Sequence, residues 1–128
     1  MHPPVYYEDL EPGTILGSQR KTLTESEIVD FAWKYDPQPF HISKPDAEES
    51  MFGGLIASGF QTLAVSFRLF WQANGLQTTN AGSGGMDNVR WTKPVRPGDT
   101  LRVEAEILER RESKSRPEIG IVRMRYTT

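Results

Sequence analysis

Residues 58–75 are predicted to form one long helix that is apolar on most of its sides. Ser58 and Gln61 have the spacing of a capping box at its start, and Gly75 lies where a helix often ends. The apolar positions extend well around the cylinder: Phe60, Leu63, Ala64, Val65, Phe67, Leu69, Phe70, Trp71 and Ala73. Because such a helix is buried on most sides, the rest of the chain is expected to surround it.

Strands are expected before and after this helix. Residues 14–23 follow a Pro-Gly turn signal, 86–95 are a further candidate, and 100–109 and 119–127 alternate between apolar and charged side chains. Strands around one buried helix favour the α+β class, with an antiparallel sheet wrapped around a long central helix. A chain of 128 residues has the length of one domain, which we expect to cover residues 1–128.

A second helix is predicted between Thr24 and Asp36. Thr24 and Glu27 have capping-box spacing, and the helix has to end near Asp36 because a proline follows. Residues 36–45 contain three prolines and are expected to be irregular. A short helical turn is expected over residues 46–52, where two glycines then stop it.

The composition limits the chemistry open to the chain. With no cysteine and two histidines, one of them at position 2, disulfides, thiolate catalysis and Cys- or His-rich metal sites are excluded. A net charge of −2 argues against a nucleic-acid partner. The sequence has no secretory signal and no apolar run near the roughly 20 residues that span a bilayer, so we expect a cytoplasmic protein without membrane contact.

The candidate catalytic segment is Asp36-Pro37-Gln38-Pro39-Phe40-His41. It places a carboxylate and the internal histidine on a short stretch stiffened by proline. An Asp beside a His can orient the ring, or the two can hold one water from two sides. The residues alone equally allow a helix-ending Asp36 and a half-buried structural His41.

Ser58-Gly59 adds a second feature, at the start of the long helix. A helix N-terminus offers unpaired N–H groups and partial positive charge. A glycine at position 59 lets a ligand approach the backbone closely, which suits a thioester oxygen that becomes an enolate. The alternative is that Gly59 permits close packing of the helix.

Taken together, these segments resemble a known family. Residues 36–41, residues 52–59 (Phe-Gly-Gly-Leu-Ile-Ala-Ser-Gly), Val89-Arg90-Trp91 and residues 94–99 (Pro-Val-Arg-Pro-Gly-Asp) are similar to the MaoC-like dehydratases. These are hotdog-fold proteins related to (R)-specific enoyl-CoA hydratases. Relatives usually carry a further strand, so the domain is expected to lack a C-terminal strand.

The resemblance implies hydration of a trans-2-enoyl-CoA to an (R)-3-hydroxyacyl-CoA, or the reverse dehydration. Asp36 and His41 would activate the water, and the Gly59 N–H would bind the thioester oxygen. Gln38, Phe40 and Ser58 would contact the substrate, and the family implies dimers or higher homo-oligomers with acyl-CoA sites at the subunit interface. No cofactor is expected, because coenzyme A is part of the substrate.

The second half of the chain, residues 65–128, carries a net charge of +4. Arg90, Lys93 and Arg96 are therefore expected near the phosphates of coenzyme A. Two other functions stay open: a hotdog acyl-CoA thioesterase, which directs water at the carbonyl carbon, and a non-catalytic acyl-CoA-binding subunit. The bulky Phe60, Phe67, Trp71 and Trp91 are expected to be core residues rather than an acyl lining.

Overall fold

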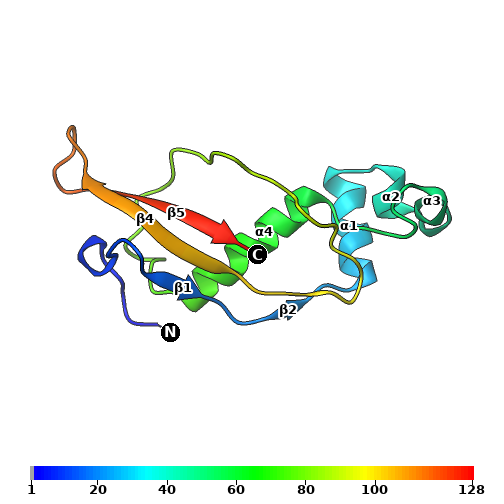
Figure 1. Cartoon of the computed structure of the whole chain (residues 1–128), viewed down its shortest axis with the longest axis horizontal. Helices are drawn as coiled ribbons and strands as arrows, with labels where there is room; N and C mark the ends of the chain where they lie inside the picture. Colours follow the sequence, from blue (N-terminus) through cyan, green and yellow to red (C-terminus); the bar gives the residue numbers. More distant parts are fainter. Residues whose placement is uncertain (1) are drawn as a thin grey trace. The chain divides into compact units, whose positions relative to one another are not determined.

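The computed structural model describes residues 2–128 (Figure 1). It contains two compact units, one formed by residues 2–20, 67–85 and 102–128, the other by residues 21–66 and 86–101. The elements in chain order are the 3-10 helix η1 (Tyr7–Asp9), β1 (Ile15–Gly17), β2 (Lys21–Thr22), α1 (Glu25–Tyr35), α2 (Pro39–Ile42), α3 (Lys44–Glu49), α4 (Gly59–Ala73), β3 (Thr100–Leu101), β4 (Glu104–Glu112) and β5 (Gly120–Thr127).

The first unit contains an antiparallel sheet in the order β1-β4-β5. Its inner side packs on the C-terminal half of α4, in a core of Leu10, Phe70, Leu76, Ala105 and Ile107. Along β5, Val122, Met124 and Tyr126 pack against this core, while Arg123 and Arg125 are exposed. The alternation that predicts a strand at 119–127 is thus confirmed, because one face is covered and the other meets solvent.

The second unit contains α1, α2, α3, the first turns of α4 and the two-stranded sheet β2-β3. Its core holds Leu23, Ile28 and Ala57, with Val65, Val95 and Leu101 packed around them. The predicted capping box of α1 is confirmed: the Thr24 side chain accepts a hydrogen bond from the Glu27 N–H, and the Glu27 carboxylate accepts one from the Thr24 N–H. Asp36 is the C-cap of α1, as its position before a proline predicts.

The two strands predicted at 14–23 and 100–109 are each interrupted. The first is divided into β1 and β2 around residues 18–20, and the second into β3 and β4 around residues 102–103. At the break the Val103 N–H donates to Ser18 Oγ, over 2.8 Å. A side-chain hydroxyl thus takes the place of a backbone carbonyl, and the regular ladder stops there.

Three other local predictions are wrong. Residues 36–45 are not irregular throughout, because Pro39 starts the short helix α2. The next helix covers Lys44–Glu49 instead of 46–52, because Ser43 is its N-cap and its side chain accepts a hydrogen bond from the Asp46 N–H. Residues 86–95 form no strand; they pair with no other strand, and Asn88 has a left-handed φ of 56°.

The long helix α4 is less buried than predicted. Phe60 and Trp91, expected in the core, are 62% and 52% exposed. Phe67 and Trp71 do pack as core residues, against Tyr126 and Phe70 respectively. Gly75 adopts no left-handed conformation; it is glycine because a Cβ there would lie against the Pro3 carbonyl oxygen.

None of the helices within residues 2–128 is long and apolar enough to cross a membrane. The cytoplasmic location expected from the sequence stays a prediction.

Candidate active site

The turn between α1 and α2 brings Asp36 and His41 into contact. His41 Nε2 lies 3.2 Å from Asp36 Oδ2, and His41 is 4% exposed. The turn is fixed by backbone hydrogen bonds: the Gln38 N–H donates to the Asp36 carbonyl over 2.8 Å and the His41 N–H to the Gln38 carbonyl over 2.9 Å. The proline-containing spacing therefore places both groups on one rigid turn.

The His41 ring is held from its other side by a backbone carbonyl. Nδ1 lies 2.7 Å from the Ile56 oxygen. Because a carbonyl oxygen can only accept, Nδ1 has to carry a hydrogen, and Nε2 is the ring nitrogen that faces Asp36. The Ile56 N–H in turn donates to the Phe40 carbonyl over 3.2 Å, so the segment around Ile56 is tied to α2.

The Asp36 carboxylate accepts two further hydrogen bonds. Gln38 Nε2 donates to Oδ1 and Ser58 Oγ donates to Oδ2, each over 2.7 Å. Burial acts to raise the pKa of Asp36, but the donors Gln38 and Ser58 and the neighbouring His41 outweigh it and lower the pKa below its ordinary value. Asp36 is thus a carboxylate at neutral pH and gains a proton only below its ordinary titration range.

The contact between His41 Nε2 and Asp36 Oδ2 is a hydrogen bond when one proton lies between the two atoms. The same Asp36 oxygen also accepts a hydrogen bond from Ser58 Oγ. A carboxylate and an imidazole that share a proton in this way can exchange protons with one reactant, which is the chemistry of general acid–base catalysis.

Ser58 connects this pair to the N-terminus of α4. It is fully buried, and its Oγ accepts a hydrogen bond from the Phe60 N–H over 3.2 Å while it donates to Asp36. The capping box expected from Gln61 is not formed, because Gln61 Nε2 donates to the Glu27 carbonyl instead. Ser58 caps the helix and holds the carboxylate with one hydroxyl group.

Gly59 is the first residue of α4, so its N–H has no acceptor inside the helix. A Cβ at this position would clash with the Trp91 indole, at Cε2. Trp91 Nε1 also donates to the Gly59 carbonyl over 2.9 Å. Close packing therefore requires a glycine here, and the packing partner is the Trp91 indole, which the sequence predicts to be a core side chain.

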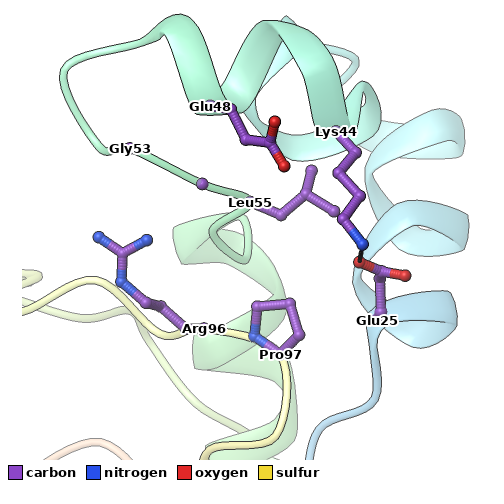
Figure 2. A pocket seen from close by; sticks show the side chains of 8 residues that line it. Glu25, Lys44, Glu48, Gly53, Leu55, Arg96 and Pro97 are labelled. Carbon is purple, nitrogen blue, oxygen red and sulfur yellow. Dashed lines mark ion pairs between the residues drawn. The ribbon is translucent and has the colours of Figure 1, made fainter.

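The other predicted substrate contacts lie on three different parts of the chain. Phe40 packs edge-on against His41 with ring centres 4.6 Å apart. Arg90 and Lys93 are exposed on the segment that precedes β3. Arg96 borders a separate pocket of about 270 Å³, together with residues of α1, α3 and the 53–55 segment (Figure 2).

Sequence reasoning missed the Ile56 carbonyl and the contact of Trp91 with Gly59. A backbone carbonyl has no residue-specific signal, so nothing in the sequence could have pointed to Ile56. Close packing of Gly59 is one of the two interpretations that the sequence allows, but its partner Trp91 lies 32 residues away along the chain.

Comparison with known proteins identifies the family. The model of the MaoC-like domain matches residues 10–127, which is most of the chain. The chain belongs to the MaoC-like dehydratase family.

Members of known structure share the fold. The MaoC-like dehydratase from Rhodospirillum rubrum superimposes with a TM-score of 0.87 at 39% identity, over 95% of this chain and 83% of that one. The R-hydratase PhaJ1 from Pseudomonas aeruginosa gives a TM-score of 0.70 at 26% identity, over 94% and 72%. The predicted α+β hotdog class of this MaoC-like domain is thereby confirmed.

A relative of assigned activity is the 3-hydroxybutyryl-CoA dehydratase of Methylorubrum extorquens. It is 31% identical over 109 residues, which cover 82% of this chain and 65% of that protein. The chain also matches 29% of the length of Protein MaoC from Klebsiella aerogenes, at 38% identity. MaoC-like domains of this type therefore occur within longer proteins, and the family supports a hydratase or dehydratase role.

Proposed function

We propose that this MaoC-like domain hydrates a trans-2-enoyl-CoA to an (R)-3-hydroxyacyl-CoA, or catalyses the reverse dehydration. The observation that carries the proposal is the Asp36–His41 contact of 3.2 Å, held by Ser58 beside the N-terminus of α4. The R-hydratase among the similar structures and the 3-hydroxybutyryl-CoA dehydratase among the relatives support the same reaction class.

The occupied lone pairs of Asp36 suggest where the water binds. A carboxylate has about four acceptor positions. Ser58 and His41 use those of Oδ2, and Gln38 uses one of Oδ1. We therefore place the water at the free position of Oδ1, next to the Gln38 amide, where Gln38 also contacts the substrate.

In the hydration direction the water oxygen forms a bond to C3 and gives up a proton to the pair. The electrons of the C2–C3 double bond move onto the thioester oxygen, which the Gly59 N–H stabilises. C2 then takes a proton from the pair, so that one water is added and the pair is restored. No separate cofactor takes part, since coenzyme A belongs to the substrate.

The test is an activity panel of trans-2-enoyl-CoAs of graded length, with product analysis. We expect loss of the enoyl absorbance and formation of the (R)-3-hydroxyacyl-CoA without release of free thiol. Release of coenzyme A would identify the alternative thioesterase. Thermal stabilisation by acyl-CoA without any turnover would identify a non-catalytic binding subunit.

The exposed cations Arg90 and Lys93 are the proposed contacts of the coenzyme A phosphates. Phe40 is a further proposed substrate contact, because its ring lies against His41 and also packs on Phe52, with ring centres 5.1 Å apart. Rim charges of this kind contribute about 1 kcal/mol or less each.

We also propose that the protein forms a homodimer or higher homo-oligomer. The second unit exposes several large apolar side chains, among them Phe60, Met86, Val89 and Trp91. Phe60 and Trp91 touch each other, with ring centres 6.0 Å apart. A second copy covering them would bury apolar area. Sedimentation at micromolar concentration is expected to show a dimer or larger species, and a monomer alone would contradict the proposal.

A further inference from the structure

The pocket beside Arg96 lies outside the Asp36–His41 pair. It has a volume of about 270 Å³, and its walls come from α1, α3, the 53–55 segment and the turn at 96–97 (Figure 2). The charged side chains at its walls are Glu25, Lys44, Glu48 and Arg96, and the apolar ones are Leu55 and Pro97. The side-chain hydrogen bonds of Asp36 and His41 within residues 2–128 go to each other, Gln38, Ser58 and Ile56 and not to the residues that line this pocket, so the pocket is available for another part of a ligand.

Arg96 is held in place before any ligand binds. Its Nη2 donates to the Phe52 carbonyl over 2.6 Å, and its backbone N–H donates to Asp99 Oδ2 over 2.8 Å. Nη1 lies so near Gly54 that a Cβ on that residue would be 3.4 Å away. A guanidinium fixed in this way loses little conformational entropy when it donates a hydrogen bond to a ligand.

The charges around the pocket balance. Lys44 Nζ lies 3.5 Å from Glu25 Oε1, which pairs two of the four charged side chains. Glu48 and Arg96 remain, and Figure 2 shows them on different sides of the open space. The Glu48 carboxylate at the same pocket as Arg96 disfavours a phosphate there, whereas a neutral group with one acceptor and one donor satisfies both Arg96 and Glu48.

The pocket is linked to the catalytic pair by one short segment. Leu55 lines the pocket, the next residue Ile56 holds the His41 ring, and Gly59 follows at the start of α4. Four residues of extended chain span at most about 14 Å. The Leu55 wall of the pocket therefore lies within reach of the arm beyond the sulfur of a substrate whose thioester oxygen lies at Gly59.

We propose that this pocket binds an amide of the pantetheine arm of the thioester substrate. Arg96 donates to the amide oxygen, Glu48 accepts from the amide N–H, and Leu55 and Pro97 pack against the methylene groups. The inference rests on the proposed function, which supplies the thioester. Coenzyme A and acyl carrier protein both contain this arm, so the pocket recognises what the two carriers share.

Binding of D-pantetheine, which carries no phosphate, tests the proposal directly by calorimetry or NMR titration. Arg96→Met and Glu48→Met are each expected to weaken its binding about three- to tenfold, because each removes one hydrogen bond at a half-open site where solvent screens the charge. The matched controls are Glu49→Met, on the same helix but outside the pocket, and Arg102→Met, which pairs with Glu104 on the surface. Both controls are expected to bind pantetheine like the parent.

Steady-state kinetics with the enoyl-CoA substrate tests the same pocket variants. With enoyl-CoA, both pocket variants are expected to raise KM by a similar factor and leave kcat unchanged. Because Arg96→Met also removes the bond to Phe52, Glu48→Met is the decisive variant, checked by an unchanged melting temperature. Unchanged pantetheine binding in Glu48→Met, or no pantetheine binding by the parent, would overturn the proposal.

Adenosine 3′,5′-bisphosphate, the phosphate-bearing half of coenzyme A without the arm, is expected to bind the pocket variants and the parent equally. Weaker binding of this nucleotide to Arg96→Met would make the pocket a phosphate site and refute the amide assignment. If the unmodified protein binds pantetheine but turns over no enoyl thioester, the result would support the pocket assignment and refute the proposed reaction. Equal KM effects with enoyl-CoA and with an enoyl-acyl carrier protein would show that the shared arm is what the pocket contacts.

Discussion

Asp36→Asn and His41→Gln are each expected to lower kcat for enoyl-CoA hydration at least about a hundredfold, because positioned acid–base groups typically contribute roughly 10²–10⁴-fold. KM is expected to change far less. The reason is that the two side chains lie 3.2 Å apart, and removing either ionisable group removes the proposed proton exchange with the substrate. Steady-state kinetics with crotonyl-CoA measures both parameters.

The double variant is expected to be little slower than either single one. Groups that act as a unit are strongly non-additive, so a second loss removes nothing further. If the two effects on kcat multiplied instead, the residues would act independently and the shared-proton arrangement would be wrong.

Matched substitutions control for charge and for the histidine itself. Asp30→Asn changes an exposed carboxylate on α1, and His2→Gln changes the other histidine, which is also exposed. Both are expected to keep parental kcat. Asp36→Asn and His41→Gln are near-isosteric and should stay folded, which circular dichroism checks. A folded single variant with near-parental kcat would show that its residue has a structural role only.

Gly59→Ala is the second substitution with a large expected effect. The new Cβ would clash with Trp91 Cε2, so either the indole or the start of α4 has to move. Overpacking of this kind costs about 1–3 kcal/mol of folding free energy. Ser58, the neighbour of Gly59, holds Asp36, and we therefore expect kcat to fall by more than about tenfold, which corresponds to about 1.4 kcal/mol.

A rescue variant separates the clash from other effects of the alanine. In Gly59→Ala/Trp91→Ala the indole is absent, so the double variant is expected to lose less unfolding free energy than the sum of the losses in the two single variants. Urea titration of the four proteins measures this coupling. Gly84→Ala is the matched control, because nothing lies within 4 Å of its Cβ position and its φ is not left-handed.

Strictly additive effects at positions 59 and 91 would contradict the packing seen here. Recovery of stability without recovery of kcat in the double variant would show instead that the indole itself serves the reaction.

Much of the local structure follows from neighbouring residues. The capping box of Thr24 and Glu27 places the start of α1, and the proline after Asp36 places its end. The alternation in 119–127 predicts β5, because one face of the strand has to meet the core. These rules act over a few residues, so the sequence displays them directly.

Information from neighbouring residues does not predict the structure where a contact with a distant segment determines it. Nothing in residues 14–23 shows that the Ser18 hydroxyl accepts from the Val103 N–H and divides two strands. The apolar pattern of 58–75 predicts burial, yet Phe60 is 62% exposed because no segment within residues 2–128 covers it. A hydropathy pattern records which side chains favour burial, and only tertiary packing decides which of them find a partner.

The candidate site divides in the same way. The spacing of Asp36, Gln38 and His41 predicts that they share one turn, because prolines restrict the backbone between them. Only the tertiary structure determines how these side chains are oriented. The Ile56 carbonyl fixes which imidazole nitrogen faces Asp36, and Ser58, 22 residues away, donates to the Asp36 carboxylate. Trp91 packs over Gly59 at the start of α4. Residue identity and spacing thus determined which groups are present, whereas contacts between distant segments decided their orientation, since hydrogen-bond direction depends on atoms that the local sequence does not place.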